Sequence, residues 1–449
     1  MKSRSMIIEP FALAHATLVT GDGQGTVLRD MTVKVGAHGR IEQVAPSIET
    51  SVPEEYHYLD ATGRYVMPGL INAHTHLFSQ GRPLDPKLAT PSGQRMVARF
   101  AHSPVDRPYI MATAKRSIRT LLDSGVTTIR TLGDVGYEAV ELRDRIAQGA
   151  MVGPRILASG PMLAIPEGHG APLVALTGST PDEARANART NIEHGANAIK
   201  IAATGGVTDA QELGEAGSPQ MTVEQMRAIC EEAHRHGIIV AAHAQSAEGV
   251  LRALTAGVDT IEHGSPLDET LIGMFRHNPN ALRGWSALVP TMSAGLPLTL
   301  VDQATTGITD IQLENAKTVA AGMVEGARQA HEAGLTVGVG TDSAMTFVPQ
   351  YATWRELDLM VRFAGFTPAE ALHAATAVNA RILNVSGTTG SLTPGKSADL
   401  LVLDRNPLDD LRALETPSLV VAAGHPVWRP KPERFDDIDA ILDEAFARG

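Results

Sequence analysis

The chain has 449 residues, of which 43% are hydrophobic and 20% charged, with 42 glycines, 27 prolines and a net charge of −12. These are globular values that exclude a disordered chain, and the length suits two domains if one of them is a barrel. Because no basic block interrupts the acidic balance, the charge argues against nucleic acid and against an anionic membrane as the main partner. A small-molecule substrate is the expected partner.

Cysteine content and the N-terminal residues bear on the compartment. The single cysteine, Cys230, can form no disulfide within the chain, which fits a reducing compartment. Residues 1–10 lack a sustained apolar core for export, and no stretch approaches the roughly 18 apolar residues of a membrane span. We therefore expect a cytoplasmic protein without membrane association.

The N-terminal region, residues 8–59, contains short alternating apolar runs separated by glycine-rich turns. Examples are residues 16–20, 31–35 and 40–44. Alternation over a few residues between turn signals predicts a small antiparallel β unit.

From residue 66 to about residue 380, apolar runs alternate with helical patterns such as 108–124 and 181–194. This alternation predicts parallel strands joined by helices. The expected strands are 66–77, 126–132, 155–159, 198–203, 238–244, 260–263, 288–292 and 336–341. Eight strands are the number that closes a (β/α)₈ TIM barrel, so an α/β barrel is the predicted fold.

After residue 380 the β pattern returns at 388–404 and 419–422, and residues 432–449 have the pattern of a terminal helix. Two β segments that flank a barrel are most simply paired in one small domain. The predicted organisation is a discontinuous β-sandwich from residues 1–64 and 386–449, with the barrel at 65–385.

Two His-x-His pairs have opposite interpretations. His74 and His76 end the first expected strand, where residues two apart share a face and can bind one metal ion. His234 and His236 end a helical pattern before Gly237, and residues two apart on a helix point about 200° apart. The second pair is therefore expected to be solvated histidines at a helix C-terminus.

Other expected strands also carry ionisable residues. Lys200 lies in the fourth strand, and the fifth, sixth and eighth strands end in His243, His263 and Asp342. The carboxyl ends of barrel strands meet at one face, where the active site of such enzymes lies. Burying these groups together would be costly without a shared ion, so the pattern predicts a metal site.

Lys200 indicates how many ions are bound. An ammonium flanked by Ile199 and Ile201 inside a barrel is unfavourable, whereas a neutral amine can add carbon dioxide and become a carbamate that bridges two cations. The predicted site holds two divalent ions, for which nitrogen and oxygen ligands favour zinc. The ligands are His74, His76 and Asp342 on one ion, His243 and His263 on the other, and Lys200 between them.

These motifs, over nearly the whole chain, resemble the metal-dependent amidohydrolase superfamily. The residues that carry the resemblance are PGLINAHTH at 68–76, Lys200 before TGGV at 204–207, His243, IEHG at 261–264, GTD at 340–342, TPAEAL at 367–372, AAT at 374–376, GSL at 390–392 and GKSADL at 395–400. Within the superfamily, Lys200 with the TGGV motif and His169 in GHG at 168–170 resemble the group of Xaa-Pro dipeptidases, Arg/Lys carboxypeptidases and N-acyl amino acid hydrolases.

The resemblance implies an amide hydrolase in which a hydroxide shared by the two ions attacks the scissile carbonyl. Asp342 would move a proton from the hydroxide to the leaving amine, and His169 would stabilise the oxyanion or hold a substrate carboxylate. Asn72 and Gln245 replace residues common in relatives; Gln245 is a candidate substrate contact. The resemblance also suggests a homo-oligomer.

Two alternatives remain open. One is a mononuclear deaminase or dehalogenase acting on a heterocycle, against which Lys200 argues. The other is a barrel that binds metal without catalysis. The amide itself is not indicated, because specificity lies in loops such as 78–107, 163–178 and 208–219.

Overall fold

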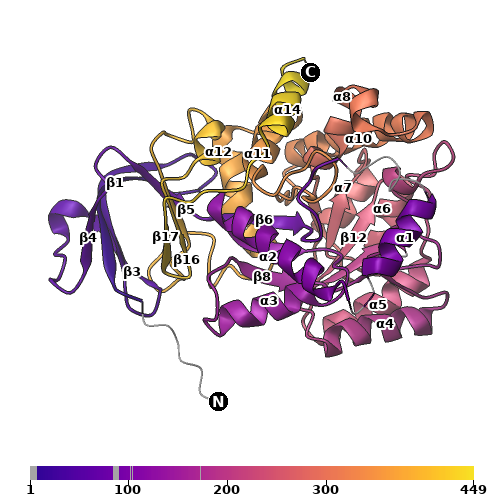
Figure 1. The fold of residues 1–449 in the computed structure, drawn as a ribbon, viewed down its shortest axis with the longest axis horizontal. Helices are drawn as coiled ribbons and strands as arrows, with labels where there is room; N and C mark the ends of the chain where they lie inside the picture. Colours follow the sequence, from indigo (N-terminus) through magenta and orange to yellow (C-terminus); the bar gives the residue numbers. More distant parts are fainter. Residues whose placement is uncertain (1–7, 84–90, 102, 104, 172, 449) are drawn as a thin grey trace.

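The computed structural model describes residues 8–83, 91–101, 103, 105–171 and 173–448. Figure 1 shows strands β1, β3 and β4 at one end of the molecule beside β16 and β17, with the helices and parallel strands at the other end. Several predictions fall partly outside the described residues: 1–7 of the predicted β-sandwich, 84–90, 102 and 104 of the specificity loop 78–107, 172 of the loop 163–178, and 449 of the predicted terminal helix.

The first sheet combines both ends of the chain. Its order is β17-β16-β15-β5-β1-β2-β3, and β4 pairs with β1. Its strands are β1 (Phe11–Val19), β2 (Val27–Val35), β3 (Ile41–Pro46), β4 (His57–Asp60), β5 (Tyr65–Pro68), β15 (Leu400–Leu403), β16 (Leu419–Ala422) and β17 (His425–Trp428). The N- and C-terminal β segments lie in the same sheet, but β5, which was predicted as part of the barrel, joins them: it pairs parallel with β1 and antiparallel with β15.

The parallel strands form two further sheets. One has the order β6-β7-β8 and the other β10-β9-β11-β12-β13-β14. Their bounds are β6 (Leu70–Thr75), β7 (Val126–Thr131), β8 (Arg155–Ala158), β9 (Met162–Ala164), β10 (Ala175–Thr177), β11 (Ile199–Ala202), β12 (Val240–Ala244), β13 (Thr260–His263) and β14 (Ala287–Val289). Seven of the eight expected parallel strands are therefore present.

Two expected strands differ from the prediction. The run 66–77 is two strands, because Gly69 separates β5 from β6 and sends β5 into the first sheet. A Cβ at Gly69 would lie 2.2 Å from the Thr127 hydroxyl, so the change of direction needs glycine. The expected strand 336–341 has one isolated bridge, Leu288 to Val337, and no continuous ladder. Only Leu400–Leu403 of the expected β run 388–404 is a strand.

Helices connect the parallel strands, and the predictions at 108–124 and 181–194 are confirmed by α2 and α4. The predicted terminal helix 432–449 is present as α14, which begins at Asp436. The α-helices are α1 (Pro91–Ala101), α2 (Arg107–Asp123), α3 (Glu138–Ala147), α4 (Pro181–Glu193), α5 (Val223–Arg235), α6 (Ala247–Ala256), α7 (Glu269–Arg276), α8 (Met292–Leu300), α9 (Gln303–Thr306), α10 (Asp310–Glu332), α11 (Thr353–Ala364), α12 (Pro368–His373), α13 (Asn379–Ile382) and α14 (Asp436–Arg448). Short helical turns are η1 (Ser47–Glu49), η2 (Val207–Asp209), η3 (Ala374–Val378) and η4 (Leu411–Glu415). Among the described residues, none of these helices has the length and apolar character needed to cross a membrane.

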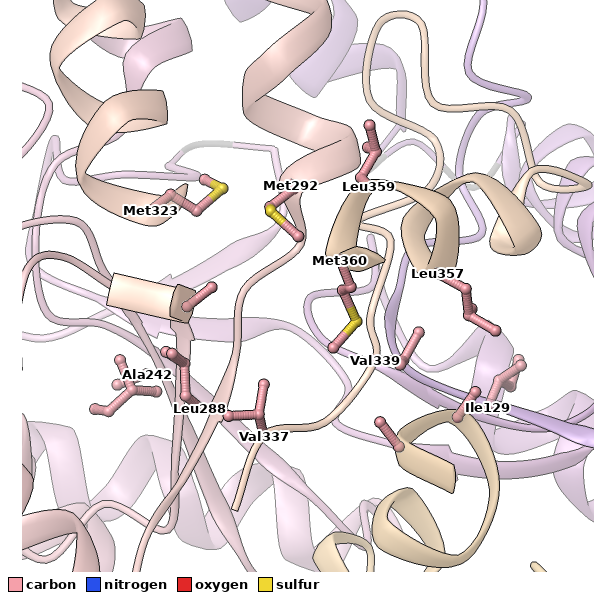
Figure 2. Packing of buried hydrophobic residues seen from close by; sticks show 14 of the residues in the cluster. Ile129, Ala242, Leu288, Met292, Met323, Val337, Val339, Leu357, Leu359 and Met360 are labelled. Atoms are coloured by element: carbon pink, nitrogen blue, oxygen red, sulfur yellow. The ribbon is translucent and has the colours of Figure 1, made fainter. Parts of the chain in front are cut away.

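The largest core cluster packs helices against the parallel strands. In Figure 2, Met292, Met323 and Met360 lie between helices and two further residues, Leu288 of β14 and Val337. Each methionine is at most 1% exposed, and burying such a side chain contributes about 1.5–3 kcal/mol. This packing holds α8, α10 and α11 against the carboxyl ends of the strands.

Candidate active site

Three predicted metal ligands converge at the carboxyl end of β6. Asp342 Oδ1 lies 2.8 Å from His76 Nε2 and 3.2 Å from His74 Nε2. All three side chains are buried, and one potential ligand atom from each lies within 4.8 Å of the others. The backbone fixes this arrangement, because the amides of Thr341 and Asp342 both donate to the His74 carbonyl.

The two imidazoles are oriented by hydrogen bonds at their other nitrogen. His74 Nδ1 donates to Glu262 Oε2 at 2.8 Å, and His76 Nδ1 donates to the Gly133 carbonyl at 2.9 Å. Each Nε2 is therefore left to accept a proton or a cation beside Asp342. A histidine held in this way by a carboxylate or a carbonyl is the usual arrangement around a protein-bound metal.

The second predicted group lies beside the first. The rings of His243 and His263 are 4.5 Å apart, and the ring of His263 is 5.3 Å from that of His74. Lys200 Nζ lies 3.5 Å from His74 Nε2. His243 Nε2 bonds to the Gly205 carbonyl at 3.2 Å, so Nδ1 is the nitrogen that could bind an ion. His263 Nδ1 bonds to Thr291 Oγ1 at 2.7 Å, so in His263 the corresponding nitrogen is Nε2.

Backbone conformation brings two of these residues into place. His263 and Asp342 have φ of 70° and 58°, in the left-handed region that side chains other than glycine rarely adopt. Strand alternation would put Glu262 and His263 on opposite faces. The left-handed turn at His263 lets both side chains reach the same cluster, and such strain is concentrated at functional sites.

The protonation states suit a metal. Burial lowers the pKa of His76, His243 and His263 below the usual range and lowers the pKa of Lys200 to about 8. Burial alone would raise the pKa of Asp342, but His74 and His76 outweigh burial and lower it. Neutral imidazoles at His76, His243 and His263 and an ionised carboxylate at Asp342 are favoured at neutral pH, and such groups are donors to a divalent cation.

A buried ion pair joins Arg130 to Glu262 beneath the site, and this pairing was not predicted from the sequence. Arg130 and Glu262 are both completely buried and lie 2.8 Å apart, and Arg130 also donates to the Ala73 carbonyl and to Thr260 Oγ1. Burial alone would raise the pKa of Glu262, but Arg130 and His74 lower it, so the carboxylate stays ionised. The signal that could have found the pair is an arginine and a glutamate inside otherwise apolar strands.

His169 is close to the second group. Its ring stacks on His243 at 4.1 Å, its Nδ1 bonds to the Asp209 carboxylate, and its backbone amide donates to Gln220 Oε1 at 2.9 Å. Asp209 and Gln220 were not predicted, because they lie 40 and 51 residues further along the chain.

Gln245 and Asn72 occupy different surroundings. The Gln245 backbone amide donates to Thr204 Oγ1, and its side-chain Oε1 is buried without a hydrogen-bond partner among the described residues. The Asn72 amide bonds to Thr341 Oγ1 at 2.8 Å, and its oxygen accepts from the His74 amide. Asn72 therefore supports the backbone of two residues next to the cluster, and the substrate contact of Gln245 stays a prediction.

The second His-x-His pair, His234 and His236, differs in one respect from the prediction. His234 is half-buried rather than solvated, because its Nε2 bonds to the buried Asp259 carboxylate at 2.8 Å. His236 ends α5 before Gly237, which has φ of 68°. The pair does not converge, in agreement with the helical interpretation.

A cavity of about 890 Å³ lies away from the cluster, and its lining includes Arg155, Asn197 and Ile239 at the amino ends of parallel strands and Asp399 and His425 from the first sheet. None of the six predicted metal ligands lines it. The grouped ionisable residues therefore belong to the opposite, carboxyl end of the strands.

Comparison with known proteins decides the family. Residues 65–427 match the sequence model of the Amidohydrolase family, which is most of the chain. The chain belongs to this family. The family is metal-dependent, and in this chain His74, His76 and Asp342 form a group that could hold a metal ion.

Solved structures and curated relatives support the same assignment. A crystal structure from Bifidobacterium longum, provisionally described as a prolidase, is 70% identical with a TM-score of 0.87 and covers 98% of this amidohydrolase and 100% of that chain. The structure of a Xaa-Pro dipeptidase with bound methionine in its active site is 27% identical with a TM-score of 0.79, and the match covers 93% of this chain and 100% of the dipeptidase chain. Ochratoxinase from Aspergillus niger is 29% identical over 335 residues. That match spans 69% of this chain but only 65% of the ochratoxinase, less than two thirds of its length.

Proposed function

We propose that this amidohydrolase is a binuclear enzyme that cleaves the amide bond of a dipeptide-like compound, an N-acyl amino acid or a related amide or carbamate. The observation that carries the proposal is the buried amine of Lys200, which lies beside His74 and close enough to His243 and His263 to lower their pKa values. A lysine with a pKa of about 8 supplies far more neutral amine for carbamate formation than an ordinary lysine does. The prolidase and dipeptidase relatives favour a peptide-like substrate.

The proposed ligands form two sets joined by Lys200. His74, His76 and Asp342 would hold one ion and His243 and His263 the other, and Lys200, as a carbamate, would be a ligand of both. Zinc suits these nitrogen and oxygen donors. When bound, the two ions supply a water of lowered pKa and a Lewis acid that polarises the scissile carbonyl.

Side chains of the protein transfer the proton and bind the substrate. Asp342, whose carboxylate is kept ionised by two histidines, accepts a proton from the attacking water and returns it to the leaving amine nitrogen. His169, held by Asp209, stabilises the developing oxyanion or binds a substrate carboxylate. Gln245 is the proposed further substrate contact.

We also infer that the parallel strands close into one (β/α)₈ barrel and that the first sheet folds as a β-sandwich. Hydrogen bonds at the two gaps between the parallel sheets support closure. At one gap, Ala198 N next to β11 donates to the Ala158 carbonyl of β8; at the other, Ala73 N of β6 donates to the carbonyl of Val339, which lies between β14 and β6. A homo-oligomer and a cytoplasmic location remain predictions. Sedimentation of the purified protein would test the first.

Product analysis tests the reaction directly. Zinc-loaded protein is incubated with dipeptides, N-acyl amino acids, aryl carbamates and aminated heterocycles, and products are identified by mass spectrometry. We expect two fragments whose masses sum to substrate plus water. Loss of ammonia or halide from an intact ring would instead support the deaminase or dehalogenase alternative, and no turnover in metal-loaded protein would favour the non-catalytic barrel.

Metal analysis of Lys200→Ala tests the bridge. The wild-type protein is expected to hold two ions per chain and the variant at most one. Lys317→Ala is the matched control, because Lys317 on α10 pairs with Glu314 and is half exposed. Two tightly bound ions and full activity in Lys200→Ala would contradict the carbamate.

A further inference from the structure

Helix α8 begins without the cap that its sequence offers. The first amides of a helix have no intrahelical acceptor, and a threonine just before the helix commonly accepts one of them. Thr291 holds this position, but it has φ of 51° and makes no capping bond. Instead, Glu356 of α11 accepts from Met292 N at 2.8 Å, Ser293 N at 2.7 Å and Ser293 Oγ at 2.6 Å. The acceptor for α8 therefore comes from 63 residues further along the chain.

The hydroxyl of Thr291 is consequently available for another partner. Thr291 Oγ1 donates to the Pro290 carbonyl at 2.7 Å, so toward His263 it acts as the acceptor of the Nδ1–H, also at 2.7 Å. This bond places the ring proton of His263 on Nδ1 and leaves Nε2 with its lone pair. His263 Nδ1 thus donates to Thr291 Oγ1, which in turn donates to the Pro290 carbonyl.

The capping glutamate is held rigidly. Glu356 is completely buried, and α11 packs on α8 through residues that include Met292 and Met360, both visible in Figure 2. Glu356 touches none of the six predicted ligands in the hydrogen bonds of the described residues. Glu356 also interacts electrostatically with Asp342, which belongs to the other ligand set. Its effect on the orientation of His263 therefore passes through the start of α8 and Thr291.

We propose that Glu356 is a positioning residue for the ion of His243 and His263: it caps α8 from a distance, which frees Thr291 to orient His263. The proposal rests on the proposed binuclear site. It assigns a function to two residues, Thr291 and Glu356, that belong to no ligand set. Hydrogen-bond partners of metal-bound histidines commonly change metal affinity by about 10- to 100-fold when they are removed.

The test compares Glu356→Gln, Thr291→Val and the double variant. Ion loss from zinc-loaded protein is measured in a chelator series. We expect the ion of the second group to bind about 10- to 100-fold more weakly in each single variant, and the ion of the first group to be retained as in the wild type. Because both changes act on the same bond to His263, the double variant should lose little more than either single variant.

Glu370→Gln is the matched control. Glu370 also accepts from a backbone amide and a hydroxyl at the start of a helix, those of Thr367 before α12, but it lies outside the candidate site. This variant should lose stability without changing ion affinity. A Glu356→Gln protein that is merely less stable and keeps wild-type affinity for both ions would overturn the proposal.

A second readout separates this proposal from the proposed function. NMR spectra of metal-free protein with ¹⁵N-labelled histidines show which ring nitrogen of His263 carries the proton. The His263 signals are identified because they are missing from the spectrum of His263→Gln. We expect Nδ1–H in the wild type and a mixture in Glu356→Gln. If the wild type bound fewer than two ions, the proposed binuclear function would be wrong. A changed His263 tautomer in Glu356→Gln would still support the positioning role of Glu356, and an unchanged tautomer would reject it.

Discussion

The two groups of predicted ligands are held in different ways. His74 and His76 both contact Asp342 directly, and their other nitrogens meet Glu262 and a strand-end carbonyl. His243 and His263 share a ring contact, and among the described residues each is held from outside the group, by Gly205 and by Thr291. The first group is preorganised by its own carboxylate, whereas the second depends on a loop and on the start of α8. Substitutions should therefore act directly in the first group and through supporting residues in the second.

Removing the carboxylate of the first group should have the largest effect. Asp342→Asn keeps the size of the side chain but loses its charge and its ability to accept a proton. We expect kcat/KM to fall by about 10²- to 10⁴-fold, the usual contribution of general acid–base catalysis, measured on the substrate found by product analysis. Asp358→Asn on α11 is the control, because this residue pairs with Arg362 away from the cluster. Activity within twofold of wild type in Asp342→Asn would refute the proposed role.

Breaking the buried pair beneath the first group should have the largest effect on stability. Glu262→Gln leaves the completely buried Arg130 without its counter-charge. Removing one partner of a buried pair costs about 3–5 kcal/mol, measured by urea unfolding of metal-free protein. Glu248→Gln, which breaks an exposed pair with Arg252 on α6, should have no measurable effect. A similar small effect for Glu262→Gln would mean that Arg130 is satisfied by Ala73 and Thr260 alone.

The support of the second group should depend on pH. Burial raises the pKa of Glu356 from 4.5 to about 7 despite its three hydrogen bonds. The folded state thus holds this proton more tightly than the unfolded state, so the stabilisation is complete below about pH 4.5 and is lost as pH rises through about 7. The change is about 3 kcal/mol. The free energy of unfolding of metal-free protein is measured across this pH range for the wild type and for Glu356→Gln. The difference between the two should decrease as pH rises, and a difference that does not vary with pH would contradict the prediction.

The smallest expected effect concerns the histidine stacked on the second group. Asp209→Asn replaces the carboxylate that holds His169 with a neutral acceptor, which weakens a charge-assisted bond. We expect kcat/KM to fall by about tenfold, since hydrogen bonds to charged groups contribute about 1.5–3 kcal/mol and Asp209 is partly exposed. Asp268→Asn, at the cap of α7, is the control. An unchanged rate would remove His169 orientation from the mechanism.

Strand patterns were sufficient to predict which ligand residues meet. His74, His243 and His263 end apolar runs, and parallel strands bring such ends to one face whatever the loops do. The patterns carried no information on Arg130 with Glu262 or on Glu356 with α8, because those contacts join residues more than 60 positions apart. Nor could alternation predict the left-handed turns at His263 and Asp342, which depend on packing around them.

The fold was predicted with similar limits. Helix and strand periods located most elements of the parallel region, and the shared β character of both chain ends indicated their pairing. The four-residue strands β4 and β17 are too short for a clear alternation, and residues 336–341 bond to strands on either side without forming a continuous ladder. The division of 66–77 required knowledge of the close approach of Thr127.

That division has a consequence for how the molecule could be taken apart. Only Gly69 separates β5 in the first sheet from β6, which carries His74, and the Gly69 amide is itself bonded to the carbonyl of Asp399 near the other end of the chain. No linker exists at this junction along which the two parts could swing or be exchanged for those of another protein. A shortened chain that began after Pro68 would expose the partners of β5 and release the first ligand strand at its amino end. The strand that carries the candidate ligand His74 and the sheet beside it therefore form one structural unit.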